Sequence, residues 1–540
     1  MFKLIVWSYL HPQEALLSVL GVCAAFFAVL LLINRVPVSY NVLNLAVRWK
    51  NTAMTALAFT MVIGLLTVML GFVNGMYALT QNSGQPGNLL ILAEGSTDES
   101  FSNLGFSDLS DLENQRGIIK DADGRPLTSR ETYLVASQPI LDPQPGRPKR
   151  RFLQVRGVDD PERSARVHNM ALQPAGGWFS DAGVREVEGR EGLSLVEVVL
   201  GNGIAGELGA DRSPEQLAKA KNQDRLEAGE TFFVGDREWY VAGVMKPSGS
   251  TYDSEVWAKQ SLIGPMFGKS GCTTLVVRTY VDRKLIEEAL DDKLTKTVKQ
   301  SVTTDEKDSS EEWISKEVDV EVPLVWLADE HKQLLDQRLA EIPEDQPDAE
   351  VSLEGLPPRT AKALHDAAAF RLKEYFTKEY EKSAVAPQVE SEYFANLSAT
   401  NIQFLVAIAV VTCIMSLGGI FGVMNTMFAT VSQRTKDIGV LRLLGYKRWQ
   451  ILVSFLLESL VLALFGGLVG CLIGSLADGF TANSIVTGGP GGGGKFVVLR
   501  ITVDSIILGC GLLLSIGMGF LGGLIPAFTA MRLTALEALR

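Results

Sequence analysis

Residues 434–445 read Arg-Thr-Lys-Asp-Ile-Gly-Val-Leu-Arg-Leu-Leu-Gly and lie between two long apolar stretches, 401–433 and 451–477. A short charged stretch between two apolar runs predicts a short helix at the membrane surface that connects two spans. Ile438, Leu441 and Leu444 recur at three-residue steps on one side of it, and Gly445 is a candidate for its C-terminus. Anchoring at the lipid headgroups is the simplest interpretation of its basic residues.

Apolar runs on both sides of this stretch predict five membrane-spanning helices. A bilayer needs about 20 residues of helix with few or no charges, and five segments meet this requirement: Ala15–Ile33, Ala53–Tyr77, Asn401–Gln433, Ile451–Ala477 and Ser505–Met531. The first is expected to be a retained anchor, because no small-x-small cleavage site follows it. The fourth contains the single charge Glu458, which is expected to face a partner helix or to reach the headgroups.

The charges of the 540 residues are unevenly distributed, with +3 in residues 1–79, −19 in 80–400 and +4 in 401–540. Nucleic-acid binding is not expected, because phosphate binding needs a basic surface. The basic segments between spans one and two and between spans three and four should be cytoplasmic. Alternation then places residues 80–400 and 478–504 outside the cytoplasm, the C-terminal tail inside, and the N-terminus outside if the first span crosses.

The long external region begins as a mixture of short strands and helices. Cys272 is its single cysteine, so no disulfide within it is expected. The fold class is therefore an α-helical integral membrane protein of about five transmembrane helices, with a large α+β extracytoplasmic domain between spans two and three. The predicted strands are Asn88–Leu92, Arg151–Val155, Leu195–Leu200, Thr231–Val234, Trp239–Val244 and Thr274–Val277, and the predicted helices are Ser213–Lys221 and Asp282–Leu294.

Residues 281–400 hold 28 acidic and 15 basic residues and differ from the rest of the external region. The pattern predicts a strand at Glu317–Val325 and charged helices at Ala328–Leu339 and Ala361–Lys382. A solvated helical insertion is the favoured interpretation, and an arm that docks a partner is the alternative.

Catalytic, metal and nucleotide chemistry is not indicated. The stretch Gly201–Gly206 resembles a dinucleotide fingerprint, but a hairpin is expected after it instead of a βαβ return, so it predicts a tight strand-to-helix turn. The stretch Gly489–Lys495 has phosphate-loop spacing, but Phe496 replaces the Ser/Thr that would hold magnesium, so a flexible loop between spans is expected. The four histidines lack metal-ligand spacing. No cofactor, metal site or catalytic residue is therefore predicted.

The segment that begins at Arg434 resembles the FtsX-like permease domain of MacB-type ABC transporters. Residues 434–442 and Gly445 follow the family's order, as does Phe455–Leu460, while Gln433, Asp437 and Leu443 depart from it. The ending Gly523–Leu533 with Glu537–Arg540 is also similar, with Ala535 in place of a proline. Asn44–Lys50 resembles the family's basic helix before a span, and Gly87–Leu92 resembles the first strand of its external core domain.

The resemblance implies five parts in a multi-pass protein of the bacterial inner membrane. Residues 1–35 would be an extra N-terminal anchor, 36–80 an amphipathic helix with a transmembrane helix, and 81–300 a MacB-like extracytoplasmic core domain. Residues 301–385 would be the acidic, largely helical insertion, and 386–540 the FtsX-like permease domain with three spans. The basic family pattern has four spans, so the anchor and the insertion are additions.

The resemblance also implies a mechanism called mechanotransmission. A non-catalytic permease subunit would pair with a second permease copy, identical or similar, and with separate ABC ATPase subunits. ATPase closure would push the helix at 432–445 and move the external domain. The residues that would couple to the ATPase are Arg434, Lys436, Asp437, Ile438, Leu441, Arg442 and Gly445.

Glycines at four-residue spacing predict close helix packing, in a moving or a static bundle. They are Gly418, Gly422, Gly466, Gly470, Gly474, Gly519 and Gly523.

Export or extraction of a substrate is the favoured function. In an efflux system a periplasmic adaptor would be a further partner. A transmitter of force to an envelope enzyme is the alternative, and a membrane-tethered binding protein without an ATPase is a third possibility that the match at 434–445 disfavours.

Overall fold

The computed structural model describes residues 21, 47, 49–140, 150–186, 194–269, 271–307, 313–325, 327–343, 346, 348–397, 399–487 and 494–533. Nearly all of the predicted first span, most of Asn44–Lys50, and the Glu537–Arg540 motif lie outside these residues. The chain divides into two compact units. The membrane unit comprises Met1–Tyr77, Thr400–Ala482 and Leu499–Arg540, and the outer unit comprises Ala78–Ala399 and Asn483–Val498.

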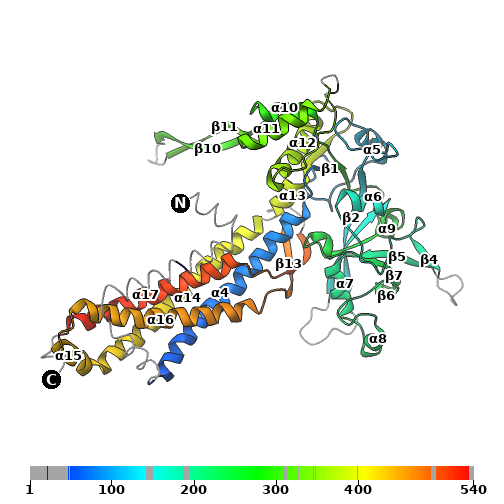
Figure 1. Ribbon diagram of the computed structural model, residues 1–540. Helices are drawn as coiled ribbons and strands as arrows, with labels where there is room; N and C mark the ends of the chain where they lie inside the picture. The colour runs from blue at the N-terminus through cyan, green and yellow to red at the C-terminus, as the bar shows by residue number, and fades with distance from the viewer. Residues whose placement is uncertain are drawn as a thin grey trace. The chain divides into compact units, whose positions relative to one another are not determined.

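Four of the five predicted spans fall on described residues, and each is a long apolar helix (Figure 1). The helices have 28 to 35 residues, so at 1.5 Å per residue each is about 40–50 Å long and exceeds the ~30 Å hydrocarbon core of a bilayer. These spans are therefore confirmed as helices of sufficient length. They are α4 (Trp49–Ser83), α14 (Ala399–Gln433), α16 (Arg448–Ser475) and α17 (Ser505–Arg532).

The outer unit is built on a ten-stranded sheet of order β12-β1-β9-β2-β3-β8-β5-β7-β6, with β4 paired to β5. Its neighbouring strands are antiparallel except for the pairs β3–β8 and β5–β7, which are parallel. The sheet confirms the predicted strands and the mixed α+β class. The strands are β1 (Asn88–Ala93), β2 (Thr128–Pro139), β3 (Arg150–Val158), β4 (Val184–Glu186), β5 (Ser194–Leu200), β6 (Thr231–Val234), β7 (Arg237–Val244), β8 (Glu255–Lys259), β9 (Thr274–Arg278) and β12 (Val385–Val389).

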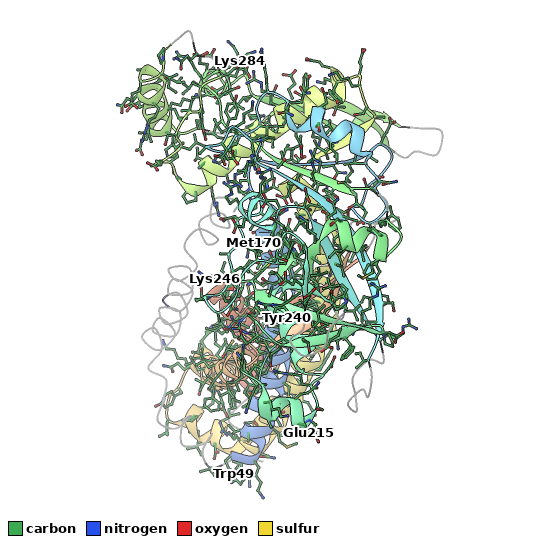
Figure 2. The ribbon with its side chains drawn as sticks, turned by 90° about the vertical axis from the view of Figure 1, so that its right-hand side faces the viewer. Trp49, Met170, Glu215, Tyr240, Lys246 and Lys284 are labelled. Carbon is green, nitrogen blue, oxygen red and sulfur yellow. The ribbon has the colours of Figure 1, made fainter. Side chains whose placement is uncertain are left out.

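Short helices pack on this sheet and form two apolar clusters with it. One cluster joins β3, β5, β7 and β8 to α7, and the other joins β1, β9 and β12 to α5 and α12. Figure 2 shows the length of the outer unit, with Lys284 on α10 far from Tyr240 on β7. The helices are α5 (Phe106–Glu113), α6 (Pro161–Val167), α7 (Asn202–Gly209), α8 (Pro214–Lys219), the 3₁₀ turn η1 (Thr251–Ser254), α9 (Gln260–Met266), α10 (Arg283–Leu290), α12 (Pro358–Lys378) and α13 (Glu390–Leu397).

The connection after β5 differs in part from the prediction. The β6–β7 hairpin is confirmed, but β7 returns parallel to β5, so the expectation that no crossover follows β5 is wrong. The strand-to-helix turn before α7 is confirmed. A Cβ at Gly201 would lie 2.5 Å from the carbonyl carbon of Asp253, so η1 fills the space in which a dinucleotide phosphate would have to sit.

The acidic segment contains more than solvated helices. A long hairpin of β10 (Thr295–Lys307) and β11 (Trp313–Pro323) precedes α11 (Asp329–Ala340). Helix α12 then contributes to two cores, because its first half packs with α10 and α11 and its second half with the sheet. The interpretation of α12 as a solvated helix is therefore wrong for its inner face, where Leu364, Ala369 and Phe376 are buried.

The segment between α16 and α17 contains strands that were not predicted. Most of Gly489–Lys495, where a flexible loop is expected, lies outside the described residues, and the residues on either side form a second hairpin, β13 (Thr481–Thr487) paired with β14 (Gly494–Arg500). Within the outer unit, the Val498 amide donates to Ser254 Oγ at 2.8 Å. The glycine-rich stretch between these strands concealed their alternation in the sequence.

Candidate functional site at the short helix α15

The stretch that begins at Arg434 forms the short helix α15 (Thr435–Leu443) between α14 and α16 (Figure 1). Arg434 is its N-cap, and the carbonyl of Arg434 accepts from the Ile438 amide at 2.9 Å. Gly445 ends it in the left-handed conformation, with φ of +93°. The amide of Tyr446 donates to Leu441 O and that of Gly445 donates to Arg442 O, which is the Schellman pattern that favours glycine at this position.

A buried ion pair joins the start of α15 to α16. Arg434 Nη1 donates to Glu458 Oε2 at 2.8 Å, and Nη2 donates to Oε1 at 3.2 Å. The two side chains are only 3% and 5% exposed, and the guanidinium lies 5.9 Å from the centre of the Phe455 ring. A bidentate arginine–carboxylate pair fixes both distance and orientation, so it holds the α14–α15 corner against the middle of α16.

Arg442 makes a second attachment near the end of α15. Its Nη1 donates to the carbonyl oxygens of Leu533 and Met531 at 3.3 and 3.5 Å, which lie at the C-terminal end of α17, where helix carbonyls lack intrahelical partners. A cation also suits the negative end of a helix dipole. Helix α15 is thus attached to both α16 and α17.

The remaining predicted residues of α15 divide between an inner and an outer face. Ile438 is 1% exposed and packs in the core of the membrane unit, and Leu441 is half-buried. Lys436 and Asp437 are exposed. Leu444 is also exposed, so it does not share the inner side that its three-residue spacing indicated.

The predicted glycines fall into three groups, two that face a neighbouring helix and one that does not. Gly466, Gly470 and Gly474 face α4, and a Cβ at Gly470 would lie 2.9 Å from the Thr60 carbonyl oxygen. Gly519 and Gly523 face α16, where a Cβ at Gly523 would lie 2.7 Å from Ser459 Cβ. By contrast, a Cβ at Gly418 or Gly422 on α14 would meet no other described residue within 4 Å. The first two groups bring helices of this chain together, and the third lies on an open face.

Sequence reasoning singled out both Arg434 and Glu458 but did not pair them. It expected Arg434 to contact or orient the ATPase, and the guanidinium is turned inward, where it pairs with Glu458. The available signal was Glu458, the one charge inside the predicted span Ile451–Ala477, since burial of a charge requires a partner of opposite sign.

Comparison with known protein families gives two matches along the chain. The MacB-like periplasmic core domain matches residues 52–293, and the FtsX-like permease C-terminal domain matches residues 409–535. The second match contains α15 and both residues of the ion pair.

Individual relatives cover smaller parts. The ABC transporter permease YknZ of Bacillus subtilis is 41% identical over 124 residues, which are 23% of this chain and 28% of YknZ. The macrolide export ATP-binding/permease protein MacB of Nitrobacter winogradskyi is 38% identical over 136 residues, 25% of this chain and 19% of that protein. The chain therefore matches less than a third of the length of either relative.

Among solved structures, the extracellular domain of the ABC-type transporter YknZ from Gram-positive bacteria is 15% identical. The match covers 36% of this chain and 83% of that domain, with a TM-score of 0.24.

The family evidence comes from the matches to the MacB-like periplasmic core domain and to the FtsX-like permease C-terminal domain. Together these two matches show that the chain belongs to the MacB/FtsX-like family of ABC transporter permeases, which are multi-span membrane proteins with an extracytoplasmic domain.

Proposed function

We propose that this permease works with a separate ABC ATPase that docks on the outer face of α15, and that ATP-driven movement of α15 drives export or extraction of a substrate on the extracytoplasmic side. The observation that carries the proposal is the division of α15 into two faces. The inner face is fixed by Arg434, Ile438 and Arg442, while the outer face presents charged and apolar side chains together.

The outer face has the composition of a docking surface. Leu443 and Leu444 are 66% and 71% exposed, and Val440, Lys436 and Asp437 are exposed beside them. Adjacent exposed leucines are unfavourable in water, so a partner that covers them gains apolar burial. The inner attachments would pass a push on this face to α16 and α17, because an ion pair and a packed core resist displacement.

Co-purification of the full chain with an ABC ATPase from the same genome tests the proposal. The double variant Leu443→Asp/Leu444→Asp should lose the ATPase, because it places charges in the apolar part of the surface. Leu476→Asp is the matched control, since Leu476 is 68% exposed at the opposite end of α16, and it should retain the ATPase. Retention by the double variant, or equal loss by the control, would contradict docking on α15.

We also propose that the open face of α14 contacts a second permease copy. Gly418 and Gly422 allow close approach there, and large apolar side chains on α14 are exposed, namely Val406, Val410, Ile414, Leu417 and Phe421. Ile414→Cys, one turn before Gly418, should form a cross-linked dimer in membranes when the native Cys413 and Cys510 are serines. Leu468→Cys on α16, which is 49% exposed, is the control that should stay monomeric.

Export is favoured over force transmission to an envelope enzyme by the size of the outer unit. A ten-stranded sheet with two apolar clusters is larger than a simple contact for a hydrolase requires. Growth of a deletion strain in the presence of amphiphilic compounds separates the two functions. Sensitivity that the wild-type gene corrects supports export, and unchanged tolerance with a cell-wall defect supports force transmission.

A further inference from the structure

The outer unit contains a buried charge network centred on Arg156 of β3. Its guanidinium is 0% exposed and donates to both oxygens of Glu255 at 2.6 and 2.8 Å. It also donates to Glu131 and, at 3.3 Å, to Glu99. The rings of Tyr133 and Tyr252 lie against it, with centres at 4.9 and 5.3 Å. One arginine thus draws three carboxylates together from separate segments.

The network continues from Glu131 to His168, which directly follows α6. His168 Nε2 lies 2.5 Å from Glu131 Oε1, and His168 Nδ1 lies 2.8 Å from the Tyr252 hydroxyl and 3.3 Å from Glu390 Oε1. Burial lowers the pKa of His168, but the Glu131 carboxylate and then Glu390 more than offset this and raise it to about 9. The imidazolium form donates from both ring nitrogens, which suits an acceptor on each side.

Glu390, the first residue of α13, is the far end of the network. Its Oε1 accepts from the Tyr252 hydroxyl at 2.9 Å, and its Oε2 accepts from the Gln85 amide at 3.1 Å and from Asn88 Nδ2 at 2.8 Å. Gln85 lies two positions after the end of α4, and Asn88 is the first residue of β1. One buried carboxylate therefore binds the segment after α4, while its own backbone begins the α13 segment that leads to α14.

Backbone packing reinforces this junction within the outer unit. A Cβ at Gly84 would lie 2.6 Å from the Cα of Ser391, so the end of α4 and the start of α13 touch directly. Ser83 Oγ accepts from the Thr251 amide of η1 at 2.8 Å. Met170, two residues after His168 and labelled in Figure 2, marks this part of the unit.

Stability alone is a weak explanation for so many buried charges. A buried ion pair can often be replaced by apolar residues of similar volume with no loss of stability, whereas it enforces one geometry among the groups that it joins. Here the groups that it joins are strands of the sheet, the segment after α4 and the start of α13, the short helix that leads to α14.

We propose that Glu390 is a positioning residue that clamps the end of α4 and the start of α13 to the sheet through His168 and Arg156, so that the two helices move the outer domain as one body. The coupling role rests on the proposed function, whereas the clamp itself can be tested without any ATPase.

Hydrogen exchange of the full-length protein, resolved by peptide mass, tests the clamp. In Glu390→Gln, residues 83–88 and 390–397 should both exchange about tenfold faster than in the wild type, because charge-assisted hydrogen bonds to both segments are weakened together. Strands β5 and β7 should keep their rates. An increase in only one of the two segments, or an equal increase in β5 and β7, would overturn the proposal.

Glu113→Gln is the matched control. Glu113 is also a buried carboxylate of the outer unit, paired with Arg130 at 2.6 Å, and it contacts neither segment through this pair. It should leave residues 83–88 and 390–397 unchanged, and a change there equal to that of Glu390→Gln would reduce the clamp to general destabilisation.

In the complex with the ATPase, Glu390→Gln should hydrolyse ATP at the wild-type rate, while the ATP-driven export or extraction of substrate should fall about tenfold. If the wild-type chain does not bind the ATPase, the proposed function is refuted, and the hydrogen-exchange result on the clamp still stands. Normal coupling in Glu390→Gln, with altered exchange, would refute the coupling role alone.

Discussion

The buried Arg434 of the membrane unit and the buried Arg156 of the outer unit are neutralised in different ways. Among the described residues, Arg434 pairs with one carboxylate, Glu458, on the neighbouring helix. Arg156 has three carboxylates, and one of them also holds His168. A single pair fixes one helix corner, whereas a shared network fixes several strands and helix ends at once. Buried charge therefore holds one helix corner in the membrane unit, whereas in the outer unit it holds several strands and helix ends in one arrangement.

The largest effect is expected from Arg156→Met in the outer unit. The substitution removes the guanidinium from three buried carboxylates, of which Glu131 keeps His168, and loss of one partner from a buried pair already costs about 3–5 kcal/mol. Thermal unfolding of the full-length protein, monitored through the protease resistance of the outer unit, should show a large loss of stability. Lys378→Met is the control, because Lys378 and its partner Glu374 are 68% and 45% exposed and an exposed pair contributes about 1 kcal/mol or less.

In the membrane unit, Arg434→Met and Glu458→Met should each cost about 3 kcal/mol of stability, because each removes one partner of a buried ion pair. The double variant should recover most of this loss, since no unpaired charge remains. Thermal unfolding of the three variants in the same detergent measures the difference. Additive losses in the double variant would mean that the pair is not the unit of interaction.

The pH dependence of the outer unit separates the two regions further. His168 has a folded pKa of about 9 against 6.5 when unperturbed, so its charged form contributes full stability below pH 6.5 and loses it as pH rises to about 9. At about 1.4 kcal/mol per pKa unit, the loss is about 3 kcal/mol. Of the groups that face it, Glu131 has a pKa of about 2 and Tyr252 a pKa well above 10, so Glu131 stays charged and Tyr252 stays neutral in this window.

Unfolding of the outer unit should therefore occur at a lower temperature at pH 9 than at pH 6.5, and His168→Gln should remove most of this difference. A wild-type profile that is flat between these pH values would contradict a charged His168.

The smallest effect on stability is expected on the outer face of α15. Lys436 is exposed, and surface substitutions of this kind usually change stability by less than about 0.5 kcal/mol. Lys436→Gln should unfold like the wild type but bind the ATPase more weakly in co-purification. A marked loss of stability would place Lys436 in the inner attachment and weaken the division of α15 into two faces.

The sequence predicted the parts of the fold that depend on local pattern. Long apolar runs predicted α4, α14, α16 and α17, and Gly445 predicted the end of α15, because only local periodicity and backbone conformation are involved. The order of the ten strands and the parallel return of β7 could not be obtained in this way, since strand pairing depends on distant segments.

The charge pairs illustrate the same limit. Arg434 and Glu458 are 24 positions apart and lie on different helices, and Asn88 and Glu390 are 302 positions apart. No spacing rule connects residues at such separations. Abundant carboxylates in residues 281–400 also concealed Glu390, which differs from the others there only in its tertiary surroundings.

The network also contains its own optical reporter. Trp257 Nε1 donates to Glu255 at 3.1 Å, and its ring centre lies 5.9 Å from that of His168. A protonated imidazole quenches indole fluorescence at short range, so emission from Trp257 should rise as His168 loses its proton. The difference in emission between the wild type and Trp257→Phe would then follow the charge on the network in the intact protein, without an added label.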